Sequence, residues 1–423
     1  MSPDSNKLHE AVPDGKSVKN LNFKVATIQV LTNGALFGAG LFIPLLAMEQ
    51  MNADIFQIGL IVALYGISLF VSSYLFGRAA DLHGRKRYLV IGLFVSGIAC
   101  LIQIFTPDLI TLALARIILG LCGGIFPSAL AAYAYERGVR MGRFTSHSAL
   151  GFGLGSIIAS LIVFNWGATG HAMGREIYNP VFVGCAVMFF ACFAILLTLP
   201  FPQEKMFKVP FFPRKIIKDN LPVYLSYFIR HTGACAVWAF FSLFIFFMQP
   251  AGTPEHVKFF WIGLINGVNG IGQFVFMQYI DKYKSETLII TGFILSAITF
   301  ALFIFVTNVW QLLLTQVLLA AAWSCLYVGS IILVMEKNPE HATSAGLLNS
   351  SLNAAQVIGP LLGGVVASIF ATYELHIGGW VLGGSGIGSI RSIMLLAVFL
   401  SLIALAVFLW SDKRSKRNHS HSA

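Results

Sequence analysis

The stretch GRAADLHGRKR at residues 77–87 places two glycines, one acid and several bases between two long apolar runs. Each run, at 55–76 and at 88–105, holds about the 20 residues that a helix needs to cross a bilayer. A short basic turn between two such runs is typical of a loop at one membrane face. The stretch therefore predicts two membrane-spanning helices joined by a charged loop.

The composition of the whole chain agrees with a membrane protein. Of 423 residues, 57% are hydrophobic and 11% are charged, and the mean hydropathy is +0.78. A soluble domain carries about 25% charged residues, so this chain has too few to cover a surface in water. The composition excludes a soluble enzyme, a disordered protein and a collagen-like protein.

Twelve apolar segments of spanning length follow one another along the chain. We expect them at 23–48, 55–76, 88–105, 109–134, 146–164, 181–199, 221–248, 259–280, 287–306, 309–334, 344–370 and 390–410. They predict a tail at 1–22, a six-helix bundle at 23–199, a central loop at 200–220, a second six-helix bundle at 221–410 and a basic tail at 411–423.

The lysines and arginines divide unevenly between the two sides of these spans. Of 28, 23 fall on the side of the chain ends, two lie inside spans, and three remain for the other side: Arg175, Lys258 and Arg391. Cytoplasmic loops carry the excess of such residues. We therefore expect both termini in the cytoplasm, and we attribute the net charge of +10 to topology and not to nucleic acid.

The two bundles resemble each other when the second is moved back by 200 positions. Phe76, Asp81 and Gly92 then coincide with Phe276, Asp281 and Gly292. Tandem six-helix halves related by an axis normal to the membrane place a substrate cavity between them. The expected fold is an all-α membrane protein with twelve helices, built as two halves around a central cavity.

The loop at 77–87 resembles the signature G-x-L-A-D-x-x-G-R-K of the major facilitator superfamily, in the loop where that family carries it. An alanine, Ala79, stands where leucine is usual. The resemblance implies the superfamily's twelve-helix fold and transport by alternating access. It also implies a gate in which Asp81 contacts the start of the eleventh span, Arg85 pairs with Glu136, and Gly77 and Gly84 permit close packing.

A second signature lies in the fourth span, where Arg116 begins the sequence RIILG. It resembles the family's R-x-x-x-G motif, which is common in proton-coupled members. An arginine inside a span costs about 2.5–3.5 kcal/mol on insertion scales, so it is usually functional or paired. Arg116 lies about 10 Å from the outer end of its span, and snorkelling to that surface is the alternative.

A third group of candidates consists of polar residues on spans that line the cavity in this family. In the seventh span, Tyr227, Arg230 and His231 share one helix face, because they are spaced i, i+3 and i+4. Arg230 is expected near the midplane, and His231 could respond to protons because histidine titrates near neutral pH. Polar residues within spans also simply join helices. The remaining candidates are Gln29, Asn33, Gln316, Trp323 and Tyr327.

The acidic residues restrict the class of substrate. All 18 Asp and Glu fall in tails, loops or span ends. With Arg116 and Arg230 inside and no acid beside them, the cavity is expected to be positive. This favours an anionic or neutral substrate over a hydrophobic cation.

The expected function is secondary transport of a small organic solute, coupled to protons, with export of a drug or metabolite. Import of an organic anion or sugar is the nearest alternative, and a membrane sensor that has lost transport is another. No phosphate-binding GxxxxGK[ST] is present, and the GSGIG stretch at 384–388 is expected to follow no strand. We expect no enzymatic activity, cofactor or metal, and a monomer in the plasma membrane.

Overall fold

The structure is a computed structural model that describes residues 15–139, 141–169, 174–201, 214–280, 282–337, 341–377, 380–384 and 386–420. Its helices are α1 Gly15–Leu41, α2 Ile43–Met51, α3 Ile55–His83, α4 Arg85–Ile102, α5 Leu109–Gly123, α6 Pro127–Glu136, α7 Met141–Ala168, α8 Asn179–Leu197, α9 Arg214–Met248, α10 Glu255–Met277, α11 Ser285–Phe305, α12 Val309–Lys337, α13 His341–Phe370 and α14 Ile387–Ser420. Two 3-10 helices, η1 Gln103–Phe105 and η2 Arg175–Tyr178, and two strands, β1 Glu374–Ile377 and β2 Trp380–Gly383, complete it.

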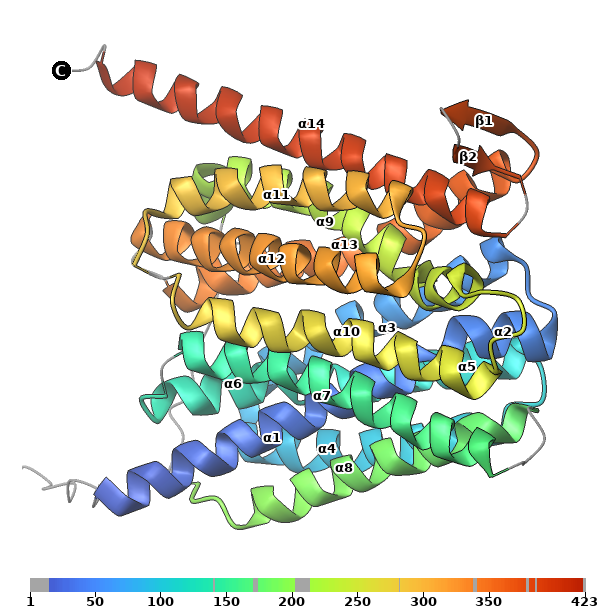
Figure 1. The fold of residues 1–423 in the computed structure, drawn as a ribbon. Coiled ribbons are helices and arrows are strands. Elements are labelled where there is room, and N and C mark those ends of the chain that lie inside the picture. The colour runs from blue at the N-terminus through green and yellow to red at the C-terminus, as the bar shows by residue number, and fades with distance from the viewer. Residues whose placement is uncertain are drawn as a thin grey trace, which may run out of the picture.

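The long helices lie side by side along one common direction (Figure 1). The start of α1 and the finish of α14 lie at the same end of this bundle, which we call the terminal end. The β1–β2 hairpin lies at the opposite end, which we call the hairpin end. Twelve helices of the described part are long and apolar enough to cross a membrane, so the expected number of spans is confirmed.

Several details differ from the sequence expectation. Helix α1 begins at Gly15, inside the expected tail at 1–22, and α14 continues to Ser420, into the tail expected at 411–423. Helix α9 begins at Arg214, ahead of the apolar run expected at 221, because its basic first turns are good helix formers and need no membrane. The expectation that no strand precedes residues 384–388 was wrong, since β2 ends at Gly383 and pairs antiparallel with β1. Gly383 and Gly384 have positive φ angles of 102° and 68°, which let the chain turn from β2 toward α14.

Helix boundaries follow from local chemistry. Asp54 and Asp108 each accept a hydrogen bond from the backbone N–H three residues on, which caps α3 and α5. The first span is broken into α1 and α2 at Phe42, and Pro44 near the start of α2 has no N–H to bond the preceding turn. This break places a helix end inside the bundle.

The two halves meet closely through glycines. A Cβ on Gly59 or Gly66 of α3 would lie 2.7 Å or 2.9 Å from a backbone oxygen of α13. A Cβ on Gly270 of α10 would lie 2.4 Å from the backbone nitrogen of Gly153 in α7. Small residues allow helix backbones to approach in this way. The α3–α13 contacts lie between the hairpin end and the middle of the bundle, whereas α7 and α10 still touch near the terminal end, where His147 lies against Phe274.

The buried apolar core shows the same asymmetry. One large cluster contains residues of both halves, and its inter-half contacts include Phe42 against Phe259, with ring centroids 5.5 Å apart. A separate cluster contains only second-half residues, among them Tyr227, Phe293 and Phe408. The core is therefore shared by the two halves toward the hairpin end, whereas the second half keeps a core of its own toward the terminal end.

Candidate functional site

Arg116, on α5, is buried in the first half, with 4% of its surface exposed. Its Nη1 donates to the carbonyl oxygen of Ala39 and to Oε1 of Gln103, at 3.3 Å each. Its guanidinium carbon lies 4.1 Å from the ring centroid of Tyr65. The alternative of snorkelling to the surface is wrong, because the side chain turns inward to these partners.

The break in the first span explains why a cation is stable there. Ala39 lies in the last turn of α1, whose carbonyl groups carry partial negative charge. Pro44 cannot donate to the neighbouring carbonyl of Gly40, and Gly40 leaves room beside the guanidinium. Arg116 therefore joins α5 to the end of α1 and to η1.

Arg230 lies near the middle of α9 and is fully buried. Its Nε donates to Oγ of Ser296 on α11 at 2.9 Å. The guanidinium carbon lies 5.3 Å from the ring of Trp323 on α12 and 5.6 Å from the ring of Phe300 on α11. Among the described residues, Nη1 and Nη2 have no hydrogen-bond partner.

The expected face of α9 comes together around one indole. The rings of His231 and Tyr227 lie 4.9 Å and 6.3 Å from that of Trp323. Nε2 of His231 lies 3.4 Å from Sγ of Cys235. The Tyr227 hydroxyl and Nδ1 of His231 have no hydrogen-bond partner within the described part of the chain. We call Tyr227, Arg230, His231 and Trp323 the α9 cluster.

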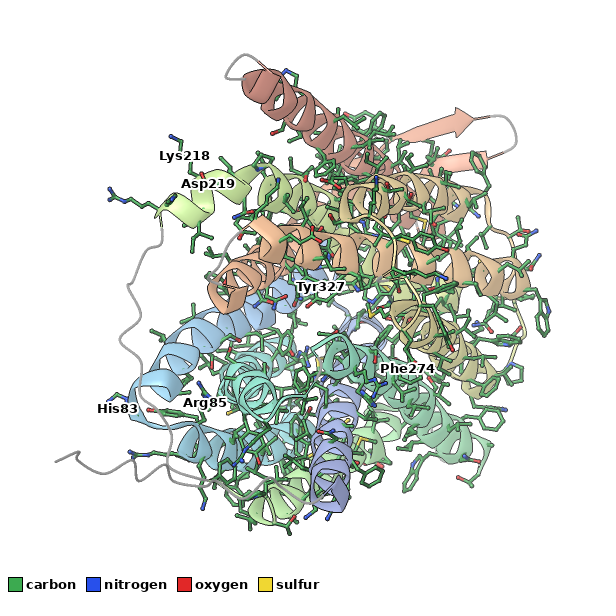
Figure 2. All side chains as sticks on the ribbon, turned by 90° about the vertical axis from the view of Figure 1, so that its left-hand side faces the viewer. His83, Arg85, Lys218, Asp219, Phe274 and Tyr327 are labelled. Atoms are coloured by element: carbon green, nitrogen blue, oxygen red, sulfur yellow. The ribbon has the colours of Figure 1, made fainter. Side chains whose placement is uncertain are left out.

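The other polar candidates connect pairs of helices. Gln316 of α12 accepts a hydrogen bond of 2.7 Å from Asn269 of α10. Tyr327 of α12 donates to Asn349 of α13 at 3.3 Å, and Figure 2 views it from the terminal end.

In the first half, Asn33 of α1 accepts from Ser148 of α7 at 2.7 Å and donates to the backbone oxygen of Gln29. These bonds provide packing between helices, and no described contact joins Gln29 or Asn33 to the α9 cluster.

The loop between α3 and α4 has the backbone that its glycines predict. Gly84 ends α3 and precedes α4 with φ 91° and ψ 139°, a region that only glycine adopts readily. A Cβ on Gly77 would lie 3.2 Å from Ser128 of α6. Arg85 is buried at 7% exposure. The side chains of Asp81 and Glu136 lie outside the described residues.

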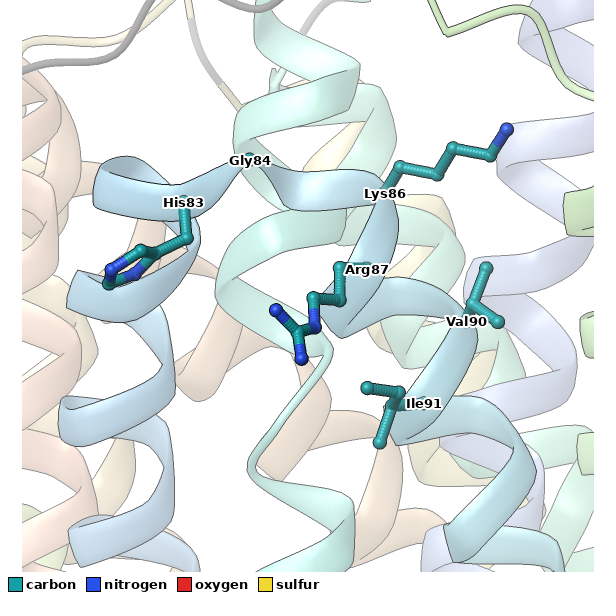
Figure 3. Close-up of a pocket in the computed structure, with 6 residues that line it drawn as sticks. All are labelled: His83, Gly84, Lys86, Arg87, Val90 and Ile91. Carbon is teal, nitrogen blue, oxygen red and sulfur yellow. The ribbon is translucent and has the colours of Figure 1, made fainter.

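A surface pocket of about 420 Å³ lies beside this loop. Figure 3 shows His83 and Arg87 on the facing ends of α3 and α4, with Ile91 one turn beyond Arg87. The lining residues are His83, Gly84, Lys86, Arg87, Val90 and Ile91. The pocket is basic and lies at the terminal end.

Several functional neighbours could not be found from the sequence. Tyr65, Gln103 and Ser296 come from helices other than those of the arginines they contact, and no local spacing links them. Cys235 could have been predicted from the sequence as a neighbour of His231, because it follows that residue by four positions, about one helical turn. In the described part no group of three His, Cys, Asp or Glu could hold a metal.

Comparisons with known proteins identify the fold and the family. The profile of the Major Facilitator Superfamily matches residues 25–272 and 259–423. An uncharacterised MFS-type transporter of Methanocaldococcus jannaschii is 24% identical over 389 residues, which cover 86% of this chain and 95% of the relative.

The multidrug resistance protein MdtG of Salmonella heidelberg is 26% identical over 383 residues, which cover 84% of this chain and 90% of that protein. Among solved structures, the nucleoside transporter NupG has a TM-score of 0.69 at 15% identity, covering 92% of this chain and 99% of its own. At that identity the likeness concerns the fold alone.

Proposed function

The chain belongs to the major facilitator superfamily, and we propose that this transporter exports a small organic solute of drug or metabolite type by alternating access. The observation that carries the mechanism is the closure of the two six-helix halves toward one end of the bundle. The similarity to MdtG supports export, since that relative is named for multidrug resistance.

Alternating access requires two halves that rock about a site between them. The glycine contacts of α3 with α13 and of α7 with α10 are suited to this motion, because backbones without side chains between them can separate cleanly. The second-half core that contains Tyr227 and Phe408 would move as one body with its half. This conformation corresponds to the state that is closed at the hairpin end.

The direction of this closure follows from the charge distribution. The excess of Lys and Arg in the loops and tails at the terminal end favours a cytoplasmic location for that end. The hairpin end then faces outward from the plasma membrane. The conformation would be inward-facing, with a solute-binding region open toward the cytoplasm.

The gate and the coupling group are part of the same proposal. Asp81, Arg85 and Glu136 close the cytoplasmic side in the opposite state, with Gly77 and Gly84 setting the path of the chain. Protons drive export through His231, Glu136 or water held by Arg116. Every described carboxylate lies near a helix end, and Glu136 is itself the last residue of α6, which leaves His231 and water held by Arg116 as the candidates within the spans.

The experiment is transport by the purified protein in liposomes with a pH dye inside and an imposed pH gradient. Organic anions, sugars and hydrophobic cations are added in turn to the wild type and to Asp81→Asn. Asp219→Asn is the matched control, because Asp219 is an exposed acid near the same end of the bundle (Figure 2). We expect solute-dependent proton movement that falls at least tenfold in Asp81→Asn and is unchanged in Asp219→Asn.

The alternatives give different results in the same assay. Solute uptake with the proton gradient, in vesicles of known orientation, would identify an importer of an organic anion or sugar. Full flux in Asp81→Asn would contradict the proposed gate. A protein that binds solutes but moves none of them would be a sensor with the transporter fold.

A further inference from the structure

The α9 cluster holds a buried positive charge that the described part of the protein does not neutralise. Arg230 is fully buried, and one serine is its hydrogen-bond partner. Contact with Trp323 and Phe300 offsets some of the cost, since aromatic faces attract cations. Nη1 and Nη2 still have no acceptor within the described ranges of the chain. A charge at this depth normally pairs with an opposite charge.

The geometry of the guanidinium favours a ligand with two oxygens. Ser296 donates its hydroxyl proton to the backbone oxygen of Gly292 at 2.7 Å and accepts from Nε of Arg230. This fixes one edge of the guanidinium, and no described residue bonds the edge formed by Nη1 and Nη2. That edge matches the two oxygens of a carboxylate, which arginine binds through paired hydrogen bonds.

Tyr227 and His231, beside Arg230, can also donate hydrogen bonds to a carboxylate. The hydroxyl of Tyr227 can donate, and Nδ1 of His231 can do so in the tautomer that carries its proton. Neither atom has a partner among the described residues. Both rings contact Trp323, which also contacts the guanidinium, so the unused donors surround one indole. Ordered water would satisfy their hydrogen bonds but would leave the charge of Arg230 uncompensated.

We propose that the α9 cluster binds the carboxylate of an organic anion, whose apolar part packs on Trp323 and Phe300. The proposal rests on the transport function above, and it names aromatic or aliphatic monocarboxylates as the substrate class. Arg230 binds the two oxygens, Tyr227 donates a further hydrogen bond, and Ser296 acts as a positioning residue. A small inorganic anion such as chloride could supply the same charge.

The test is equilibrium binding of radiolabelled benzoate to the full-length protein in detergent, with benzamide as the uncharged analogue. We expect saturable binding that benzamide does not displace. Arg230→Gln should weaken binding at least tenfold, Arg230→Lys by less, and Tyr227→Phe severalfold. Arg391→Gln is the matched control, because Arg391 of α14 donates to the backbone oxygen of Val306 and lies outside the cluster.

The outcomes separate the site from the transport function. Equal binding in wild type and Arg230→Gln, or no saturable binding in the wild type, overturns the proposal. Displacement of benzoate by millimolar chloride, with flux that depends on chloride, assigns the site to an inorganic anion and overturns the substrate class. Flux of a neutral or cationic solute that survives Arg230→Gln leaves transport intact and refutes this site alone. Arg230→Lys controls for misfolding, because it keeps the charge.

Discussion

Arg116 and Arg230, the arginines inside the spans, differ in their contacts. Arg116, in the first half, contacts a helix-end carbonyl, an amide oxygen and a tyrosine ring at 4.1 Å. Arg230, in the second half, has a serine at Nε, and its two terminal nitrogens have no hydrogen-bond partner among the described residues. The contacts of Arg116 are typical of a structural residue that connects helices. The contacts of Arg230 are typical of a residue that binds a ligand.

The two halves also differ at positions that the internal repeat makes equivalent. A shift of 200 residues relates Arg116 to Gln316 and Gly84 to Lys284. Gln316 joins α12 to α10 through Asn269, so this position connects helices in both halves with different chemistry. Gly84 has φ 91°, whereas Lys284 precedes α11 with an ordinary φ of −60°. The halves share an architecture, and of these two loops the first has a glycine turn with positive φ whereas Lys284 has an ordinary backbone.

The largest expected effect concerns these two loops. Gly84→Val should reduce transport at least tenfold, because a branched side chain is strained at φ 91° and the turn that carries the gate must change. Lys284→Val should keep transport within twofold, because its backbone suits any residue. The measurement is solute flux in liposomes at matched protein content. Equal flux in the two variants would show that the glycine turn does not control the gate.

A smaller effect is expected on stability. Arg116→Met should destabilise the protein by about 2 kcal/mol, because it leaves the Ala39 carbonyl and the Gln103 amide without a donor. Arg230→Met should leave stability unchanged or raise it, since removing an uncompensated buried charge is favourable. Thermal unfolding in detergent, without added anions, compares them. If Arg230→Met destabilised the protein more than Arg116→Met, the assignment of Arg116 to a structural role and of Arg230 to ligand binding would be contradicted.

The smallest effect is expected at Gln316. Gln316→Leu should cost about 1 kcal/mol, because Nδ2 of Asn269 loses its acceptor. Adding Asn269→Leu should recover only the part of this loss that is due to Nδ2, because Nε2 of Gln273 then loses Oδ1 of Asn269 as its acceptor. A double-mutant cycle of unfolding free energies measures the coupling. Strictly additive losses would mean that this bond does not join α10 to α12.

The sequence predicted the spans well because a membrane imposes a simple rule on apolar length. It also placed Tyr227, Arg230 and His231 on one face of a helix, since that relation depends on spacing alone. It left open whether Arg116 snorkels or pairs, and it did not find Ser296 or Tyr65, because these neighbours come from other helices. The expected roles of Asp81 and Glu136 remain predictions.

By itself, the sequence determined that this is a twelve-span membrane protein with two related halves and a basic side. Apolar length, loop charge and internal repetition are local or additive properties of a chain. The tertiary structure decided which polar atoms find partners. Hydrogen bonding in a bundle depends on where distant helices cross. Only the tertiary structure therefore gives Arg116 a carbonyl partner and leaves two nitrogens of Arg230 without a partner in the described part of the chain.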